Sequence, residues 1–235
     1  MKFYKKKKFL DKAFILLFIL VVAYFQDDIK KYFSSKEIVS YSLIDIPEYT
    51  NKKFIYLNDN VPNFKDSDLT TTSFEKYGEL DELGRCTTAF ANLGKDLMPN
   101  KERDYIGMIK PTGWQYSKYD FIEGEYLYNR CHLIAYQLSG ENANPNNLIT
   151  CTRSMNADVM NNFEIKVGNY IRKTNNHVLY RVTPIFKDNN LIATGVQIEA
   201  LSVEDNGSGI KFNVFIYNVE DKVKINYLDG TNSLK

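Results

Sequence analysis

The residues around His132 bring together side chains that could perform acid–base chemistry. The segment YNRCHL places an amide, a cation and an imidazole within four residues, at Asn129, Arg130 and His132. Because an imidazole titrates near neutral pH, His132 could accept a proton from a nucleophile. The chain has only one other histidine, His177, so few positions could supply such a base.

Two polar residues further along the chain, Asn156 and Glu164, could complete a metal site. Amide and carboxylate oxygens are ligands suited to Mg²⁺, Mn²⁺ or Ca²⁺. One imidazole beside a few such oxygens suits metal-assisted phosphodiester hydrolysis, in which the imidazole takes a proton from water. Eight residues of unbroken helix rise about 12 Å, too far for Asn156 and Glu164 to share one ion directly. Either Glu164 acts through water, or the helix is interrupted between them.

Other interpretations of His132 stay open at this point. In a strand, adjacent side chains point to opposite faces, so Cys131 and His132 could not form a nucleophile–base pair. A zinc site built from His132 and the cysteines Cys86, Cys131 and Cys151 lacks the tight ligand spacing of known zinc frameworks. Composition alone favours a buried, hydrogen-bonded His132 without a catalytic role. We interpret His177 as structural, a cation at the end of the predicted helix.

The hydrophobic pattern predicts an α+β domain that would position these residues. Apolar residues recur at three- and four-residue spacing from Ser154 to Thr174, which is typical of an amphipathic helix with Ser154 as its N-cap. Turn-forming segments separate the apolar runs that follow the helix, and residues 139–147 form a loop by composition. The predicted strands span residues 54–57, 126–138, 178–186, 191–201 and 210–219. A helix followed by antiparallel strands indicates an α+β fold.

The first 26 residues have a charge pattern of their own. Six lysines surround or precede a 13-residue apolar run from Ala13 to Phe25, which is typical of an export signal with cleavage after Ala23. As a helix, this run would be about 20 Å long, shorter than the roughly 30 Å hydrocarbon core of a bilayer. That length favours a signal peptide, although an uncleaved membrane anchor also fits. We expect a leader at 1–26, a spacer at 27–50 and a globular domain at 51–235.

Composition and charge limit what this domain could bind. The chain has 235 residues, is 44% hydrophobic and has a net charge of +1, which excludes intrinsic disorder. The leader carries +5, so the rest of the chain carries −4 and would need a local basic cleft to bind a polyanion. Export would allow one disulfide among the three cysteines, with one thiol left over; three free thiols fit as well.

Residues 129–171 resemble the DNA/RNA non-specific endonucleases with a ββα-metal (His-Me finger) fold, in particular the streptococcal-type DNA-entry and secreted DNases of Firmicutes. The segment reads NRCHLIAYQLSGENANPNNLITCTRSMNADVMNNFEIKVGNYI. The segments LDELGRCTTAF, IGMIKPTGW, HVLYRVTPIF and GVQIEALSVEDNG extend the resemblance over about residues 75–230. The family signature Asp-Arg-Gly-His is replaced here by Asn129, Arg130, Cys131 and His132.

The resemblance implies a role for each candidate residue. His132 takes the place of the general base, Asn156 that of the metal ligand, and Glu164 that of an acidic residue near the water shell of the metal. Arg130 matches the signature arginine, Arg85 a strand arginine that contacts the scissile phosphate, and we add Arg153 as a substrate-binding cation.

The resemblance also implies a cofactor, a substrate and a location. The cofactor would be Mg²⁺ or Mn²⁺, and the substrate would be DNA or RNA, cut to 5′-phosphate ends outside the cytoplasmic membrane. Because Asn129 and Cys131 depart from the signature, an inactive component that binds DNA for uptake is the alternative. No inhibitor or immunity protein can be identified from one chain.

Overall fold

The computed structural model describes residues 40–41 and 45–235. The expected leader at 1–26 and most of the expected spacer at 27–50 lie outside the described residues. Within the described ranges, we find no helix that combines the length and the apolar character needed to cross a bilayer.

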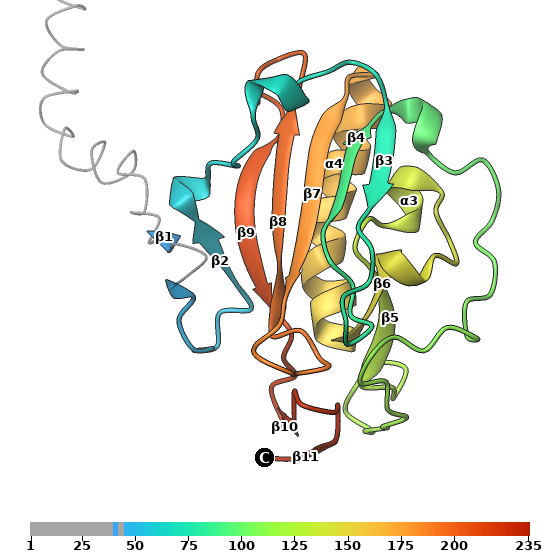
Figure 1. The fold of residues 1–235 in the computed structure, drawn as a ribbon, viewed down its shortest axis with the longest axis vertical. Coiled ribbons are helices and arrows are strands. Elements are labelled where there is room, and N and C mark those ends of the chain that lie inside the picture. The colour runs from blue at the N-terminus through green and yellow to red at the C-terminus, as the bar shows by residue number, and fades with distance from the viewer. Residues whose placement is uncertain (1–39, 42–44) are drawn as a thin grey trace, which may run out of the picture. The chain divides into compact units, whose positions relative to one another are not determined.

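A seven-stranded sheet forms the centre of the fold (Figure 1), with the strand order β1-β2-β9-β8-β7-β4-β3. All neighbouring strands are antiparallel except β1 and β2, which are parallel. The three longest strands confirm the strands expected after the helix. The strands are β1 (Ser40–Tyr41), β2 (Phe54–Leu57), β3 (Phe74–Tyr77), β4 (Ala89–Leu93), β7 (Val178–Ile185), β8 (Gly195–Ser202) and β9 (Lys211–Tyr217).

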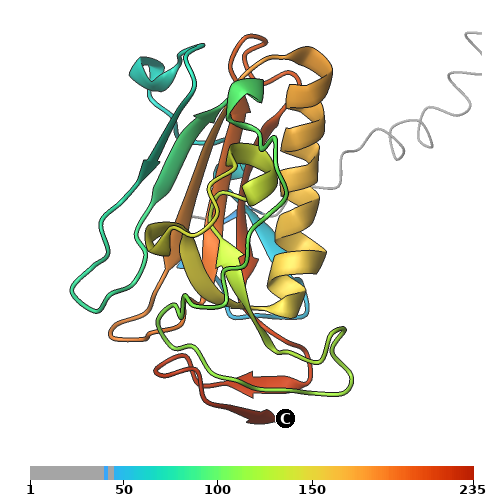
Figure 2. The same ribbon diagram turned by 90° about the vertical axis from the view of Figure 1, so that its right-hand side faces the viewer.

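One long helix covers a face of this sheet (Figure 2). α4 (Asn161–Thr174) buries Phe163, Val167 and Ile171 in the main core against the sheet, as the apolar spacing predicts. The predicted helix begins correctly at Ser154, but its first part, η6 (Ser154–Met160), is π-helical. The expected N-cap is wrong, because Arg153 occupies that position and makes no capping bond through its side chain.

A two-stranded hairpin lies outside the main sheet and leads directly into the helix. β5 (Tyr128–His132) pairs antiparallel with β6 (Leu148–Thr152), and η6 and α4 follow. The predicted strand at 126–138 is too long, because the chain turns after His132 into α3 (Tyr136–Ser139). Residues 139–147 are confirmed as a connection, which ends in the 3-10 turn η5 (Pro145–Asn147). The order strand, strand, helix is the ββα unit of the expected fold.

A disulfide joins the two strands of this hairpin. Cys131 and Cys151 are bonded, with their Cα atoms 5.9 Å apart, and both side chains are fully buried. Cys86 is a buried free thiol. The zinc interpretation fails, because two of its four ligands are consumed by the disulfide.

Segments at both ends of the described chain complete the fold. Ile46 and Tyr49 pack on a buried cluster at the β2–β9 edge, and Pro47 accepts a hydrogen bond from the Tyr217 hydroxyl at 2.8 Å. The packed unit therefore begins before residue 51. At the other end, β10 (Val223–Ile225) and β11 (Asn232–Leu234) form a small hairpin that follows the last strand of the sheet.

Candidate active site

The ββα unit brings four of the expected site residues to one cavity of about 360 Å³. His132 ends β5, Asn156 lies in η6 and Glu164 lies in the first turn of α4. Arg130, on the same strand as His132, also lines the cavity. Residues that are 34 positions apart in the sequence thus meet because the hairpin and the helix pack against each other.

The hydrogen bonds of His132 define which of its nitrogens can act as a base. Nε2 lies 2.8 Å from the backbone carbonyl of Asn142, which can only accept, so Nε2 carries the proton. Nδ1 is therefore unprotonated and holds the lone pair that can accept a proton. The side chain is buried, and burial lowers the pKa of the imidazole to about 4. His132 is consequently neutral at neutral pH and can accept a proton at Nδ1.

Arg103 is a member of the site that the sequence analysis missed. Its Nη2 lies 3.2 Å from Nδ1 of His132, and its side chain lines the same cavity. Arg103 makes no ion pair within 4.0 Å among the described residues, so its charge is available to an anion. In the sequence it lies in the charged run KERD, which looks like an ordinary solvated loop.

Glu164 is buried at the wall of the cavity. Burial raises the pKa of its carboxyl to about 8, while Gln137 and Arg103 act in the opposite direction. A carboxyl with so high a pKa is stabilised in its charged form by any cation that enters the cavity. Glu164 is therefore suited to face a metal ion or its water.

The donor chemistry of the site fits a hard divalent cation. Nδ2 of Asn156 lies 3.5 Å from Oδ1 of Asn129, a weak contact that leaves the amide oxygen of Asn156 for another partner. No group of three or more His, Cys, Asp or Glu residues that could hold a metal occurs in the described part of the chain. Few protein ligands, all oxygens, suit an ion such as Mg²⁺ that keeps most of its water. The π-helical geometry of η6 around Asn156 is itself frequent at functional sites.

Arg130 is held in place by a loop that crosses in front of β5. Its Nη2 donates to the carbonyl of Gly107 at 2.8 Å, and its Nε donates to the carbonyl of Ile109. The guanidinium also lies over the Trp114 ring, 4.0 Å from the centroid. The loop thus fixes a cation at the edge of the cavity that contains His132.

The structure does not bring Arg85 to this cavity. Arg85 binds Asp81 at 2.6 Å and donates to the backbone carbonyls of Asp188 and Asn190 at 2.7 and 3.0 Å. It lines neither the cavity around His132 nor the neighbouring one. In this structure Arg85 therefore joins two loops.

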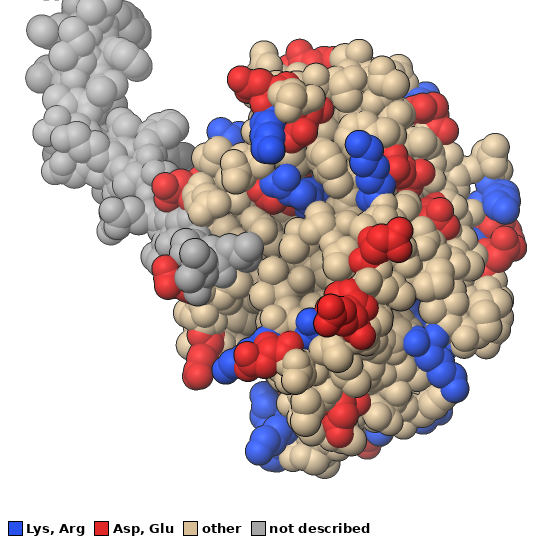
Figure 3. All heavy atoms as spheres, in the orientation of Figure 1, with Lys and Arg blue, Asp and Glu red and all other residues tan. Residues whose placement is uncertain are grey.

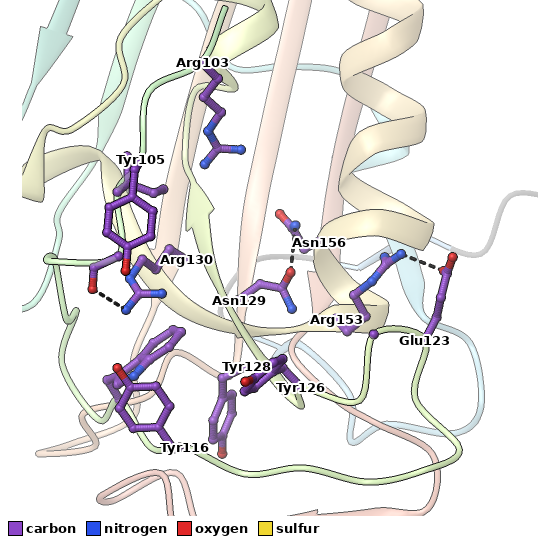
Figure 4. Close-up of a pocket in the computed structure, with 14 residues that line it drawn as sticks. Arg103, Tyr105, Tyr116, Glu123, Tyr126, Tyr128, Asn129, Arg130, Arg153 and Asn156 are labelled. Carbon is purple, nitrogen blue, oxygen red and sulfur yellow. Dashed lines mark hydrogen bonds and ion pairs between the residues drawn. The ribbon is translucent and has the colours of Figure 1, made fainter.

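Arg153 and His177 have defined partners. Arg153 lines a neighbouring cavity, where its Nη2 binds Glu123 at 2.7 Å (Figure 4). His177 lies beyond the helix, with Nδ1 2.6 Å from Glu204 Oε1 and its backbone N–H donating to the same carboxylate. The structural interpretation of His177 agrees with these contacts, although its partner is Glu204 instead of the helix end. His132 is left as the imidazole that faces the cavity.

The charge on the visible surface is mixed. On the face shown in Figure 3, basic and acidic side chains are interspersed and much of the surface is uncharged. This distribution agrees with the net charge of −4 outside the leader. The described residues on this face therefore form no continuous basic surface.

This fold is that of the ββα-metal nucleases. Residues 62–204 match the sequence profile of the DNA/RNA non-specific endonucleases, and the chain belongs to this family. No curated protein sequence matches the chain.

Solved structures show the same relationship. NucA from Streptococcus agalactiae with a bound magnesium ion is 26% identical, covers 90% of this chain and 95% of its own, and superposes with a TM-score of 0.71. The metal-free form of NucA superposes with a TM-score of 0.69. It is also 26% identical, and the match covers 90% of this chain and 96% of that one. The Sda1 nuclease with bound zinc is 25% identical over 69% of this chain and 81% of its own, with a TM-score of 0.58.

Proposed function

We propose that this protein is an exported, divalent metal-dependent endonuclease that hydrolyses phosphodiester bonds of DNA, and also of RNA, without selecting a base sequence. The observation that carries the proposal is the neutral His132, whose unprotonated Nδ1 accepts a hydrogen bond from Arg103 beside a cavity that also contains Asn156, Glu164 and Arg130. The magnesium bound to NucA supports Mg²⁺ as the ion, and the zinc bound to Sda1 shows that a relative accepts another divalent metal.

The proposed mechanism assigns the proton transfer to His132. Water attacks phosphorus, Nδ1 accepts the proton from that water, and the bond to the 3′ oxygen breaks, leaving a 5′-phosphate and a 3′-hydroxyl after protonation. The Asn142 carbonyl holds the Nε2–H throughout, which keeps Nδ1 oriented and stabilises the imidazolium that forms. Arg103 and Arg130 would offset the negative charge of the phosphate.

Asn156 would hold the ion directly, and Glu164 would do so through an intervening water. When bound, the ion would supply stabilisation of the charge that develops on the phosphate and on the leaving oxygen. Contacts made mainly to phosphate carry no base information, which accounts for cleavage without sequence preference.

A plasmid-nicking assay with Mg²⁺ tests the proposal. We expect the parent protein to nick supercoiled DNA, EDTA to abolish nicking, and His132→Ala to be slower by roughly 10²- to 10⁴-fold. His177→Gln is the matched control, because it alters the other histidine at its contact with Glu204. Cleavage that survives EDTA refutes the metal role, and a His132→Ala variant as fast as the parent refutes the base.

The signature change at Asn129 supports a second candidate, a DNA-binding or uptake component that does not cut. Asn129 stands where the family signature has an aspartate, and it contacts Asn156. The change from a carboxylate to an amide therefore falls beside the proposed metal ligand. Cys131 does not add to this argument, because its side chain is buried in the disulfide. Gel-shift binding without cleavage under Mg²⁺ or Mn²⁺ would favour this candidate.

Export rests on the sequence of residues 1–26. We propose that the chain is secreted, or stays anchored on the outer face of the cytoplasmic membrane if the leader is not cleaved. The N-terminal sequence of the protein recovered from medium and from membranes distinguishes the two: a mature protein starting after Ala23 indicates cleavage, and an intact leader in the membrane fraction indicates an anchor.

A further inference from the structure

A second cavity, of about 490 Å³ (Figure 4), shares lining residues with the proposed catalytic cavity. Arg103, Arg130 and Asn156 line both cavities, so the two are neighbours at the residues proposed to hold the phosphate and the ion. A volume of this size is within the range of small-molecule sites. A group that enters the second cavity would therefore lie next to the phosphate being cut.

The walls of this second cavity are aromatic and exposed. Tyr105, Tyr116 and Tyr126 line it, with 80%, 67% and 48% of their surfaces exposed. Among the described residues only one other aromatic side chain, Phe121, is similarly exposed, at 38%. Exposed apolar surface gathered at one place marks a binding site more often than scattered residues do.

The aromatic groups are positioned by fixed contacts. Trp114 forms a T-shaped pair with Tyr116, with ring centroids 5.9 Å apart, and its ring lies 4.0 Å from the Arg130 guanidinium. The backbone of Gly113 packs closely against Gly230: a Cβ atom added at Gly230 would lie 2.0 Å from the Gly113 carbonyl oxygen. The loop that contains Gly113 therefore packs on the C-terminal segment. Tyr128, beneath the cavity, donates to the Gly230 carbonyl at 2.9 Å. The Trp114 and Tyr116 part of the wall is therefore held in place, and an ordered wall loses little entropy when a ligand binds.

We propose that this cavity, lined by Tyr105, Tyr116, Tyr126 and Trp114, binds an unpaired base of the substrate strand next to the scissile phosphate. Every base has a π-face, so stacking on these rings tolerates any sequence. The arginines shared with the catalytic cavity would hold the adjoining phosphate.

A preference for unpaired substrate follows from this site. In a duplex the base is stacked and paired, and it must be turned out before it can enter the cavity, which opposes binding. The enzyme would therefore act faster on single-stranded or locally opened nucleic acid than on intact duplex. This inference rests on the proposed nuclease function, but base binding can be measured without cleavage.

The single tryptophan of the chain allows a direct binding test. Trp114 lines the cavity, so an occupying base should quench its fluorescence. With the His132→Ala variant in EDTA, we expect an oligothymidylate to quench the emission and bind about tenfold or more tightly than an abasic strand of equal length and charge. Equal affinity for the two strands overturns the proposal, because phosphate contacts alone would then explain binding.

Substitution of the rings provides the second arm. Tyr105→Ala with Tyr116→Ala should weaken oligothymidylate binding by about tenfold or more and leave abasic-strand binding unaltered, whereas the matched Phe pair should bind like the parent. An equal loss for both strands overturns the base site, because the tyrosines would then only support the loop. The comparison of oligothymidylate with the abasic strand uses a protein that keeps both tyrosines. It therefore tests the base site even if the Ala pair folds poorly.

Cleavage separates the failure of this proposal from that of the nuclease proposal. With Mg²⁺, the ratio of kcat/KM for single strand over duplex should exceed one in the parent and fall in the Ala pair. Cleavage of both substrates with an unaltered ratio refutes the base site and leaves the nuclease standing. If neither substrate is cleaved, the proposed nuclease function is refuted. Stronger quenching by oligothymidylate than by the abasic strand would still support the base site in that case.

Discussion

The guanidinium of Arg103 donates to Nδ1 of His132, the nitrogen that must accept a proton if His132 is the base. The two atoms, Nη2 and Nδ1, are 3.2 Å apart. A cation at this place opposes protonation of the imidazole, and it acts in the same direction as burial on the pKa of His132. Water can reach Nδ1 only when this hydrogen bond opens, which a phosphate that attracts Arg103 would favour.

Replacement of Arg103 should therefore have two separate effects. We expect Arg103→Ala to lower kcat/KM by roughly 10- to 10³-fold, because one cation facing the phosphate is lost. We also expect the pKa of His132 to rise, which an NMR titration can follow because the chain has only two histidines. Arg103→Lys, which keeps the charge, is the control. An unchanged pKa in Arg103→Ala would show that the contact does not persist in solution.

Acid should destabilise the protein through His132. The pKa of this imidazole is about 4 in the folded protein and about 6.5 when unfolded, so between these values only the unfolded chain takes up the proton. The contribution is fully present above about pH 6.5, and the free energy of unfolding should fall by up to about 3 kcal/mol as the pH drops toward 4. Urea unfolding near pH 7 and near pH 5 measures this loss. His132→Gln should reduce the difference between the two pH values; an unreduced difference assigns it to other groups.

Removal of the Asn156 amide should weaken the metal dependence selectively. In Asn156→Ala we expect the Mg²⁺ concentration for half-maximal cleavage to rise by roughly 10- to 100-fold, or cleavage to be lost, while thermal unfolding in EDTA changes little. Asn162→Ala is the matched control, because Asn162 is exposed in α4, which directly follows η6, and does not line the cavity. A normal Mg²⁺ requirement in Asn156→Ala would remove Asn156 from the metal site.

Arg85 should contribute to stability and not to chemistry. Arg85→Ala breaks the contact with Asp81 and the bonds to two backbone carbonyls, and we expect a loss of about 1–3 kcal/mol in the free energy of unfolding. Activity per folded molecule should remain that of the parent. A large fall in kcat without a change in stability would instead restore the phosphate-binding role that the sequence suggested.

The Cys131–Cys151 disulfide should be a large single contribution to stability. It closes a loop with a sequence separation of 20, so replacing both cysteines with Ala should lower the free energy of unfolding by about 3 kcal/mol. Dithiothreitol should destabilise the parent and leave the double variant unchanged. Equal sensitivity of the two proteins to the reductant would show that the bond is not formed.

Local patterns predicted the parts of this molecule that depend on neighbouring residues. The spacing of Phe163, Val167 and Ile171 is that of a helix packed on one face, and the structure has that helix. The strand β6 was missed because all five of its residues are buried, which leaves no alternation to detect. The π-helical start at Ser154 was missed too, because an i to i+5 pattern leaves no distinct apolar spacing over one turn.

Site residues that lie within one continuous motif could be predicted from the sequence. Residues that reach the site only through tertiary packing could not. His132, Asn156 and Glu164 fall in one continuous family-like segment, and they meet in one cavity. Arg103 comes from a loop that precedes the hairpin by more than 20 residues, so only the packing of that loop reveals its contact with His132. Arg85 lies in a family-like segment of the sequence, but in the structure it joins two loops and does not line the cavity.

The disulfide of the β5–β6 hairpin would also make the proposed nuclease sensitive to the redox state of its surroundings. Cys131 precedes His132 on the same strand, so the cross-link anchors the strand that carries the proposed base. In the reducing cytoplasm this bond does not persist, and the hairpin would lack the anchor. If the chain is exported as proposed, the hairpin that carries His132 would gain this cross-link only in an oxidising environment, after the chain has left the compartment that holds the chromosome of the producing cell.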